Sequence, residues 1–151
     1  MITVKTLNLS IKSLRDFAKK KLTDEVLIDL DHKDECPLKL VRTLCDPDQI
    51  GIQLLFVPED CGGFGGGAFD VYRICEEMAR MDLGVATSVL ATFLGSDPIH
   101  VGGTPEQKKK WLSKIADEGI LFASGATEPN AGCELGVLDT IAVRVMEDDK
   151  I

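Results

Sequence analysis

The spacing of apolar residues changes once along the chain, near Gly119, and this change limits the possible folds more than any other feature. Before it, apolar side chains recur every three or four residues, which is the period of amphipathic helices. After it the pattern is strand-like, with one apolar run at 119–126 and another near 140–146. The sequence therefore predicts a mainly α chain, with a helical domain at 1–118 and the first strands of a β-domain at 119–151.

Three helices are predicted in the first 48 residues from caps and helical spacing. We expect them to begin at Ser10, Thr23 and Pro37 and to end near Leu22, Asp31 and Asp46. Ser and Thr favour helix N-termini because their hydroxyls accept backbone N–H groups, and Pro suits the first turn. We expect the apolar run at 49–57 to be extended and to end at Pro58.

A fourth helix is predicted at 68–81, after a glycine-rich run at 62–67. Its inward stripe comprises Val71, Ile74, Cys75, Met78 and Ala79, and its outward face comprises Asp70, Arg73, Glu77 and Arg80. The spacing Gly63-x-Gly65-x-x-Ala68 also fits the loosest dinucleotide-binding fingerprint. That fingerprint needs a strand that leads directly into the turn, and 58–60 intervene, so a turn and helix start is the favoured interpretation.

Two more helices are predicted before the pattern changes. A neutral helix at 85–94 should end at 95–98, where Gly95 and Pro98 disfavour its continuation. The clearest helix start in the chain follows, because Thr104 can cap, Pro105 can occupy the first helical position and Gln107 can complete a capping box.

The composition is that of an ordinary soluble globular protein, with 44% hydrophobic and 28% charged residues. The formal net charge of -8, from 17 basic and 25 acidic residues, disfavours nucleic acid and anionic membranes as partners. The longest uncharged run, 83–96, is shorter than the ~20 residues of a membrane span. Five scattered cysteines and no visible signal peptide indicate a reducing cytoplasm, and the cysteine and histidine spacing predicts no metal site.

The loop Thr127-Glu128-Pro129-Asn130-Ala131-Gly132-Cys133 carries the strongest functional signal. It lies between the two predicted strands, and its small residues would let a flat or anionic ligand approach the main chain closely. A Pro-containing turn between two strands is the alternative interpretation, and spacing alone does not decide between them.

Four further landmarks occur in order before this loop. Residues 58–65 read P-E-D-C-G-G-F-G, 74–80 read I-C-E-E-M-A-R, 97–99 read D-P-I, and 103–112 read G-T-P-E-Q-K-K-K-W-L. Together with T-E-P-N-A-G at 127–132, this ordered set resembles the acyl-CoA dehydrogenase family over roughly residues 49–146.

The resemblance implies an N-terminal helical domain followed by a β-barrel-like central domain, with FAD lying against both and against a C-terminal helical bundle. The implied reaction, part of fatty acid metabolism, is α,β-dehydrogenation of an acyl-CoA thioester. A carboxylate takes the α-proton and the flavin accepts the β-hydride. The catalytic glutamate would lie in the bundle, so no catalytic residue is assigned here. This chain is expected to be the N-terminal portion of the enzyme, which on its own should lack turnover and hold FAD poorly. The implied partners are acyl-CoA, an electron-transferring flavoprotein or similar acceptor, and further copies of the chain.

By position, the resemblance implies cofactor contacts from Ser124, Ala126, Thr127, Gly132 and Cys133. Ala126 and Thr127 would present backbone N–H groups, and Thr127 its hydroxyl, to the pyrimidine edge of the flavin. Gly132 would allow close approach. Cys133 stands where the family usually has serine and would contact the pyrophosphate and the acyl-CoA, although a thiol donates more weakly than a hydroxyl.

A second hypothesis is a catalytically inactive helical interaction module, or a subunit, that keeps the same fold. A partner would then cover the apolar faces that an incomplete cofactor cleft leaves exposed. The ending at 147–151, within a predicted strand or hairpin, favours the first hypothesis.

Overall fold

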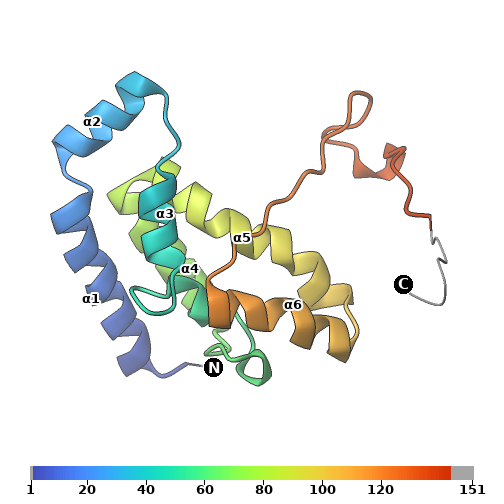
Figure 1. Ribbon diagram of the computed structural model, residues 1–151, viewed down its shortest axis with the longest axis horizontal. Helices are drawn as coiled ribbons and strands as arrows, with labels where there is room; N and C mark the ends of the chain where they lie inside the picture. The colour runs from blue at the N-terminus through green and yellow to red at the C-terminus, as the bar shows by residue number, and fades with distance from the viewer. Residues whose placement is uncertain (1, 144–151) are drawn as a thin grey trace.

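The computed structural model describes residues 2–143, and its three N-terminal helices follow the predicted order (Figure 1). Helix α1 is Val4–Lys21, α2 is Asp24–Lys33 and α3 is Leu38–Cys45. Helix α1 begins well before the predicted cap at Ser10, because the Thr3 hydroxyl accepts the Thr6 N–H at 3.1 Å. Thr23 caps α2 as predicted, accepting the Val26 N–H at 3.4 Å.

The run at 49–57 was expected to be extended, and that prediction is wrong. It contains a short 3₁₀ helix, η1 (Ile52–Leu55), and a second one, η2 (Glu59–Cys61), follows it. Three consecutive amides of the glycine-rich run donate to carbonyls of 49–57: Phe64 to Leu54 at 2.7 Å, Gly65 to Val57 at 2.9 Å and Gly66 to Leu55 at 2.7 Å. These amides are therefore engaged within the fold, which agrees with the turn interpretation rather than with phosphate binding. A side chain at Gly63 would overlap the Val57 carbonyl, so this packing requires glycine.

Three longer helices follow, α4 (Ala68–Met81), α5 (Leu83–Gly102) and α6 (Pro105–Glu118). The predicted capping box of α6 is confirmed, since the Thr104 hydroxyl accepts the Gln107 N–H at 3.3 Å and the Gln107 side chain accepts the Thr104 N–H at 2.9 Å. Helix α5 continues through 95–98, so the predicted helix end there is wrong.

Two carboxylates of α4 are buried, although the sequence pattern places them in water. Asp70 is 7% exposed because its carboxylate accepts the Gly67 N–H at 2.9 Å and caps the helix. Glu77 is 8% exposed because it pairs with Arg15 on α1. Helical periodicity reveals neither a cap nor an ion pair to a helix that is far away in the sequence. Asp70 and Glu77 were therefore both assigned to the wrong face.

Helices α4 and α5 pack against each other at the centre of the helical part, α1 packs on α4, and α3 and α6 pack on α5 (Figure 1). The main hydrophobic cluster joins α1, α3, η1, α4 and α5, with Leu14, Ile74 and Val89 fully buried. A second cluster lies between η2 and α6 and consists of Val57, Cys61, Leu112, Ile115 and Ala116. Helix α5 contacts both clusters, since its Ile99 packs against the second one.

The segment after α6 is irregular. Within residues 119–143 the structure contains an isolated bridge between Glu128 and Ala131 and a short 3₁₀ helix, η3 (Leu135–Val137), but no strand. The strand predicted at 119–126 is not formed, and the second is not formed over 140–143, while 144–146 lie outside the described residues. A strand needs a partner with which it exchanges backbone hydrogen bonds, and residues 2–143 offer none.

Across the described part of the chain, no helix combines the length and the hydropathy needed to cross a lipid bilayer.

Candidate functional site

The loop that the sequence singled out closes through a tight turn. The Ala131 N–H donates to the Glu128 carbonyl at 3.2 Å, and the Glu128 N–H donates to the Ala131 carbonyl at 2.8 Å. Pro129 suits the second position of such a turn because its ring fixes φ. Ala131 is buried, whereas Thr127 and Gly132 on either side of the turn are exposed. The residues on both sides of the turn are therefore accessible to solvent.

The Glu128 side chain holds the loop against the segment that follows it. Its two carboxylate oxygens accept the N–H of Thr140 at 2.9 Å and the N–H of Asp139 at 2.8 Å. Hydrogen bonding by Thr140 and Asp139 lowers the pKa of the Glu128 carboxyl. A carboxylate that is committed to two backbone amides and has a lowered pKa is poorly suited to act as a general base. We therefore assign Glu128 a structural role.

The five residues assigned to a cofactor from the sequence are all exposed and lie on irregular backbone: Ser124, Ala126, Thr127, Gly132 and Cys133. Among residues 2–143, no oxygen accepts the backbone N–H of Ala126 or Thr127. A Cβ added at Gly132 would meet nothing within 4 Å, and the Cys133 thiol is exposed. Two donors and an open approach to the main chain are therefore available on this loop.

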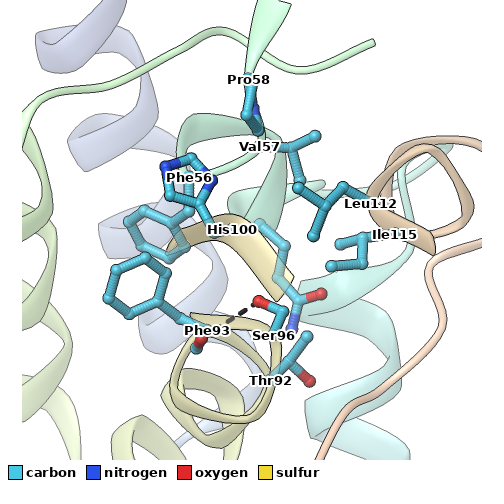
Figure 2. A pocket seen from close by; sticks show the side chains of 10 residues that line it. Phe56, Val57, Pro58, Thr92, Phe93, Ser96, His100, Leu112 and Ile115 are labelled. Atoms are coloured by element: carbon cyan, nitrogen blue, oxygen red, sulfur yellow. Dashed lines mark hydrogen bonds between the residues drawn. The ribbon is translucent and has the colours of Figure 1, made fainter. Parts of the chain in front are cut away.

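A separate, small and mostly apolar pocket lies between η1, α5 and α6 (Figure 2). Figure 2 shows Leu112 and Ile115 on one side, and the Phe56 and Phe93 rings, 5.3 Å apart at their centroids, on the other. The ten lining residues are Gln53, Phe56, Val57, Pro58, Thr92, Phe93, Ser96, His100, Leu112 and Ile115. None of the five predicted cofactor residues is among them, so the pocket and the loop are distinct places.

Gln53 is the most constrained polar group of this pocket. Its side-chain nitrogen donates to the Val89 carbonyl at 3.3 Å and to the Cys45 sulfur at 3.0 Å. Its oxygen is buried and has no partner within the described residues. Burial raises the pKa of the Cys45 thiol to about 12, so this sulfur stays protonated and unreactive. The Cys45 thiol next to Gln53 is therefore not an activated nucleophile.

Metal chemistry finds no support within residues 2–143. No group of three or more His, Cys, Asp or Glu side chains there is arranged to hold a metal ion.

Helix α5 carries an apolar stripe on the face that is turned away from the core. Leu83, Leu94 and Val101 are 67%, 63% and 74% exposed. Their separations of eleven and seven residues are close to whole helical turns, so the three side chains share one face. The exposed Thr87 lies on the same face between Leu83 and Leu94.

Sequence reasoning missed two residues of α5 that hold the start of the loop segment, Thr92 and Gly95. The Thr92 hydroxyl accepts the Phe122 N–H at 3.0 Å, and Gly95 lies directly under the backbone of Ala123. Gly95 was interpreted as part of a helix end. An isolated glycine within a helical pattern also signals close backbone packing, and that signal could have identified it.

Comparison with known proteins shows which family has this architecture. The model of the acyl-CoA dehydrogenase N-terminal domain matches residues 6–119. The caffeyl-CoA reductase-Etf complex subunit CarC of Acetobacterium woodii is 36% identical over 135 residues, which cover 87% of this chain and 34% of CarC. The short-chain specific acyl-CoA dehydrogenase of Megasphaera elsdenii is 36% identical over 138 residues, which cover 89% of this chain and 35% of that protein.

The fold comparison agrees. A chain from the structural work on the electron transferring flavoprotein of Acidaminococcus fermentans, directed at flavin-based electron bifurcation, superposes with a TM-score of 0.76 at 26% identity. The match covers 91% of this chain and 35% of that chain. This chain thus spans about a third of the length of the proteins it matches here. Because the matched N-terminal domain takes up most of its residues, the chain belongs to the acyl-CoA dehydrogenase family.

Proposed function

We propose that this chain is the N-terminal portion of an FAD-dependent acyl-CoA dehydrogenase that removes two hydrogens from the α and β carbons of an acyl-CoA thioester. The observation that carries the proposal is that no oxygen of residues 2–143 accepts the N–H of Ala126 or Thr127, next to an open Gly132, in a chain of this family. The proposed organisation is a helical domain at 1–118 and the beginning of a central domain at 119–151.

The loop fits a flavin on three counts. The N–H groups of Ala126 and Thr127 can donate to the pyrimidine edge of the ring, with the Thr127 hydroxyl as a third donor. The open space at Gly132 lets a flat ring approach the main chain. Ser124 and Cys133 are both exposed and would complete the contact set. Cys133 would also contact the acyl-CoA.

Bound FAD supplies the acceptor for the hydride. The chain's own donors at 126 and 127 would stabilise the negative charge that develops on the pyrimidine edge, and donors at that edge favour reduction. The general base is not assigned to any residue of this chain, because Glu128 is committed to the amides of Asp139 and Thr140.

We assign an electron-transferring flavoprotein or a similar protein as the electron acceptor. The support is that CarC, a relative of this chain, is named as a subunit of a reductase-Etf complex. A homo-oligomer and a cytoplasmic location remain predictions from the sequence.

The second candidate function is a catalytically inactive interaction module. The observation that favours it is the exposed apolar stripe of Leu83, Leu94 and Val101 on α5, which a partner subunit could cover. This reading predicts partner binding without affinity for FAD, so a flavin titration separates the two candidates.

The test is a titration of the purified chain with FAD, followed by flavin fluorescence, in the wild type and two glycine variants. Gly132→Val places a branched side chain where the ring would lie. Gly136→Val is the matched control, because a Cβ at Gly136 also meets nothing within 4 Å but lies beyond the proposed contact set. We expect Gly132→Val to weaken FAD binding tenfold or more, about 1.4 kcal/mol, and Gly136→Val to leave it nearly unchanged. Absence of binding by a folded wild-type chain up to ~1 mM FAD would count against the proposal.

A further inference from the structure

The segment that leads into the loop is seated on α5 by a side-chain hydrogen bond. Thr92 is only 2% exposed, and its hydroxyl oxygen accepts the Phe122 N–H at 3.0 Å. The same hydroxyl lies 3.5 Å from the Phe122 carbonyl oxygen, to which it can donate. Thirty residues of chain separate the two partners, so this contact is tertiary rather than local. The buried Thr92 side chain therefore makes the hydrogen bonds to the Phe122 backbone that a neighbouring strand would make.

Gly95, one turn further along α5, makes the close approach possible. A Cβ at this position would lie 2.8 Å from the N, C and O atoms of Ala123, closer than real Cβ contacts. Glycine disfavours a helix interior, and its presence in the middle of α5 is explained by the main chain that crosses it. Thr92 and Gly95 together form what we call the α5 seat.

Side chains of the segment alternate between the two core clusters. Ile120 and Phe122 pack against the second cluster, beside α6, whereas Leu121 packs against the main cluster. Alternation of this kind fixes the rotation of the backbone, because a one-residue shift would exchange the two sets. The α5 seat fixes the position of the segment, and the two clusters fix its orientation.

We infer that Thr92 and Gly95 are positioning residues for the proposed cofactor contacts. The first of these contacts is Ser124, which directly follows Ala123, the residue that packs on Gly95. The N–H groups of Ala126 and Thr127 lie only a few residues beyond the seat, so its geometry limits where they point. Anchoring the start of this segment reduces how much of it must be ordered when a ligand binds, which lowers the entropic cost of binding. The flavin part of this inference rests on the proposed function, whereas the seat itself does not.

The experiment compares substitutions at the seat with matched substitutions elsewhere on α5. Thr92→Val removes the hydroxyl with little change of shape, and Thr92→Ser retains it. Thr87→Val is the control, because the Thr87 hydroxyl is exposed and bonds within its own helix to the Leu83 carbonyl. Gly95→Ala adds the obstructing methyl, and Gly102→Ala is its control, since a Cβ at Gly102 meets nothing within 4 Å.

Two readouts are measured on each variant, hydrogen exchange of the 120–127 amides and affinity for FAD. In Thr92→Val and Gly95→Ala we expect the Phe122 amide to exchange at least tenfold faster and FAD to bind several-fold more weakly, about 1 kcal/mol or more. Thr92→Ser and both controls should stay close to the wild type. Melting temperatures measured in parallel identify any variant that has lost its global fold, and Thr92→Val decides the matter if Gly95→Ala does not fold.

An unchanged exchange rate of the Phe122 amide in Thr92→Val would show that Thr92 does not hold the segment on α5. Faster exchange with unchanged affinity for FAD would overturn the positioning role. If the wild-type chain does not bind FAD, the proposed function fails, and the exchange rates alone still decide whether Thr92 and Gly95 hold the segment.

Discussion

Glu77 joins α4 to α1 through a two-pronged ion pair with Arg15. The guanidinium donates from Nε to one carboxylate oxygen and from Nη2 to the other, each at 2.7 Å. The Glu77 side chain is 10% exposed and the Arg15 side chain 54%, so one partner is buried and the other reaches solvent. Hydrogen bonding by Arg15 is the main reason that the pKa of the Glu77 carboxyl is lowered. The pair therefore stabilises the fold only while the carboxylate is ionised.

The first prediction concerns Glu77→Gln, which we expect to lower the free energy of unfolding at pH 7 by about 1–2 kcal/mol, a modest value because Arg15 is half solvated. Because the folded pKa is depressed, the contribution is complete above the ordinary value of about 4.5 and is lost as the pH falls through the lower folded pKa. Urea denaturation at pH 7 and below pH 4.5 checks both points, and the difference between variant and wild type should shrink in acid.

Glu76→Gln is the control for this prediction, because among residues 2–143 Glu76 pairs only with Arg73 and Arg80 on its own helix, at 3.0 Å and 3.5 Å. We expect a change within about 0.5 kcal/mol, as for other surface pairs. Equal losses at Glu76 and Glu77, or a loss at Glu77 that does not depend on pH, would contradict the assignment.

At the scale of the helix, the start of α6 depends on two exposed side chains, Thr104 and Gln107. The Thr104 hydroxyl and the Gln107 side chain each satisfy a backbone N–H that would otherwise lack a partner at the first turn. Leu112, Ile115 and Ala116, which form most of the second core cluster, lie on the same helix. Loss of the cap should therefore loosen that cluster as well.

The second prediction is that Thr104→Ala destabilises the protein by about 1 kcal/mol and lowers Tm by ~2–4 °C, as is usual for loss of a cap in a domain of this size. Thr104→Ser keeps the hydroxyl and should stay within a fraction of that loss. Thermal unfolding followed by circular dichroism measures both variants, and a Ser variant as unstable as the Ala variant would show that the hydroxyl is not the cause.

The helices differ in how far the sequence could predict them, and the differences have physical causes. Local signals sufficed for α2 and α6, whose caps at Thr23 and Thr104 are confirmed. They failed for the end of α5, because Ser96 and Ile99 are held by core contacts that outweigh the local preferences of Gly95 and Pro98. The main remaining errors, at Asp70, Glu77 and 49–57, arise where capping or tertiary contacts override periodicity.

At the scale of the whole molecule, the folded unit extends beyond the helices. The motifs of the sequence identify the family and the loop at 127–133, since a motif is local by nature. They do not reveal that 121–123 dock on α5, because a contact between two residues thirty positions apart, Thr92 and Phe122, produces no periodic pattern in the sequence. The expected strands depend on partners that residues 2–143 do not include, so no local pattern could form them there.

The third prediction follows from this docking. Residues 124–143 are largely exposed and make few hydrogen bonds, so local opening there costs little, whereas 120–122 are held by Thr92 and both core clusters. Within the described residues, brief digestion with subtilisin should therefore cut first between Ser124 and Val143 and leave a resistant core that ends near Ala123, as measured by mass spectrometry. In Thr92→Val the core should shorten toward Glu118, where α6 ends. Early cuts inside α4 or α5, or a wild-type core that already ends at Glu118, would contradict a folded unit that includes the docked segment.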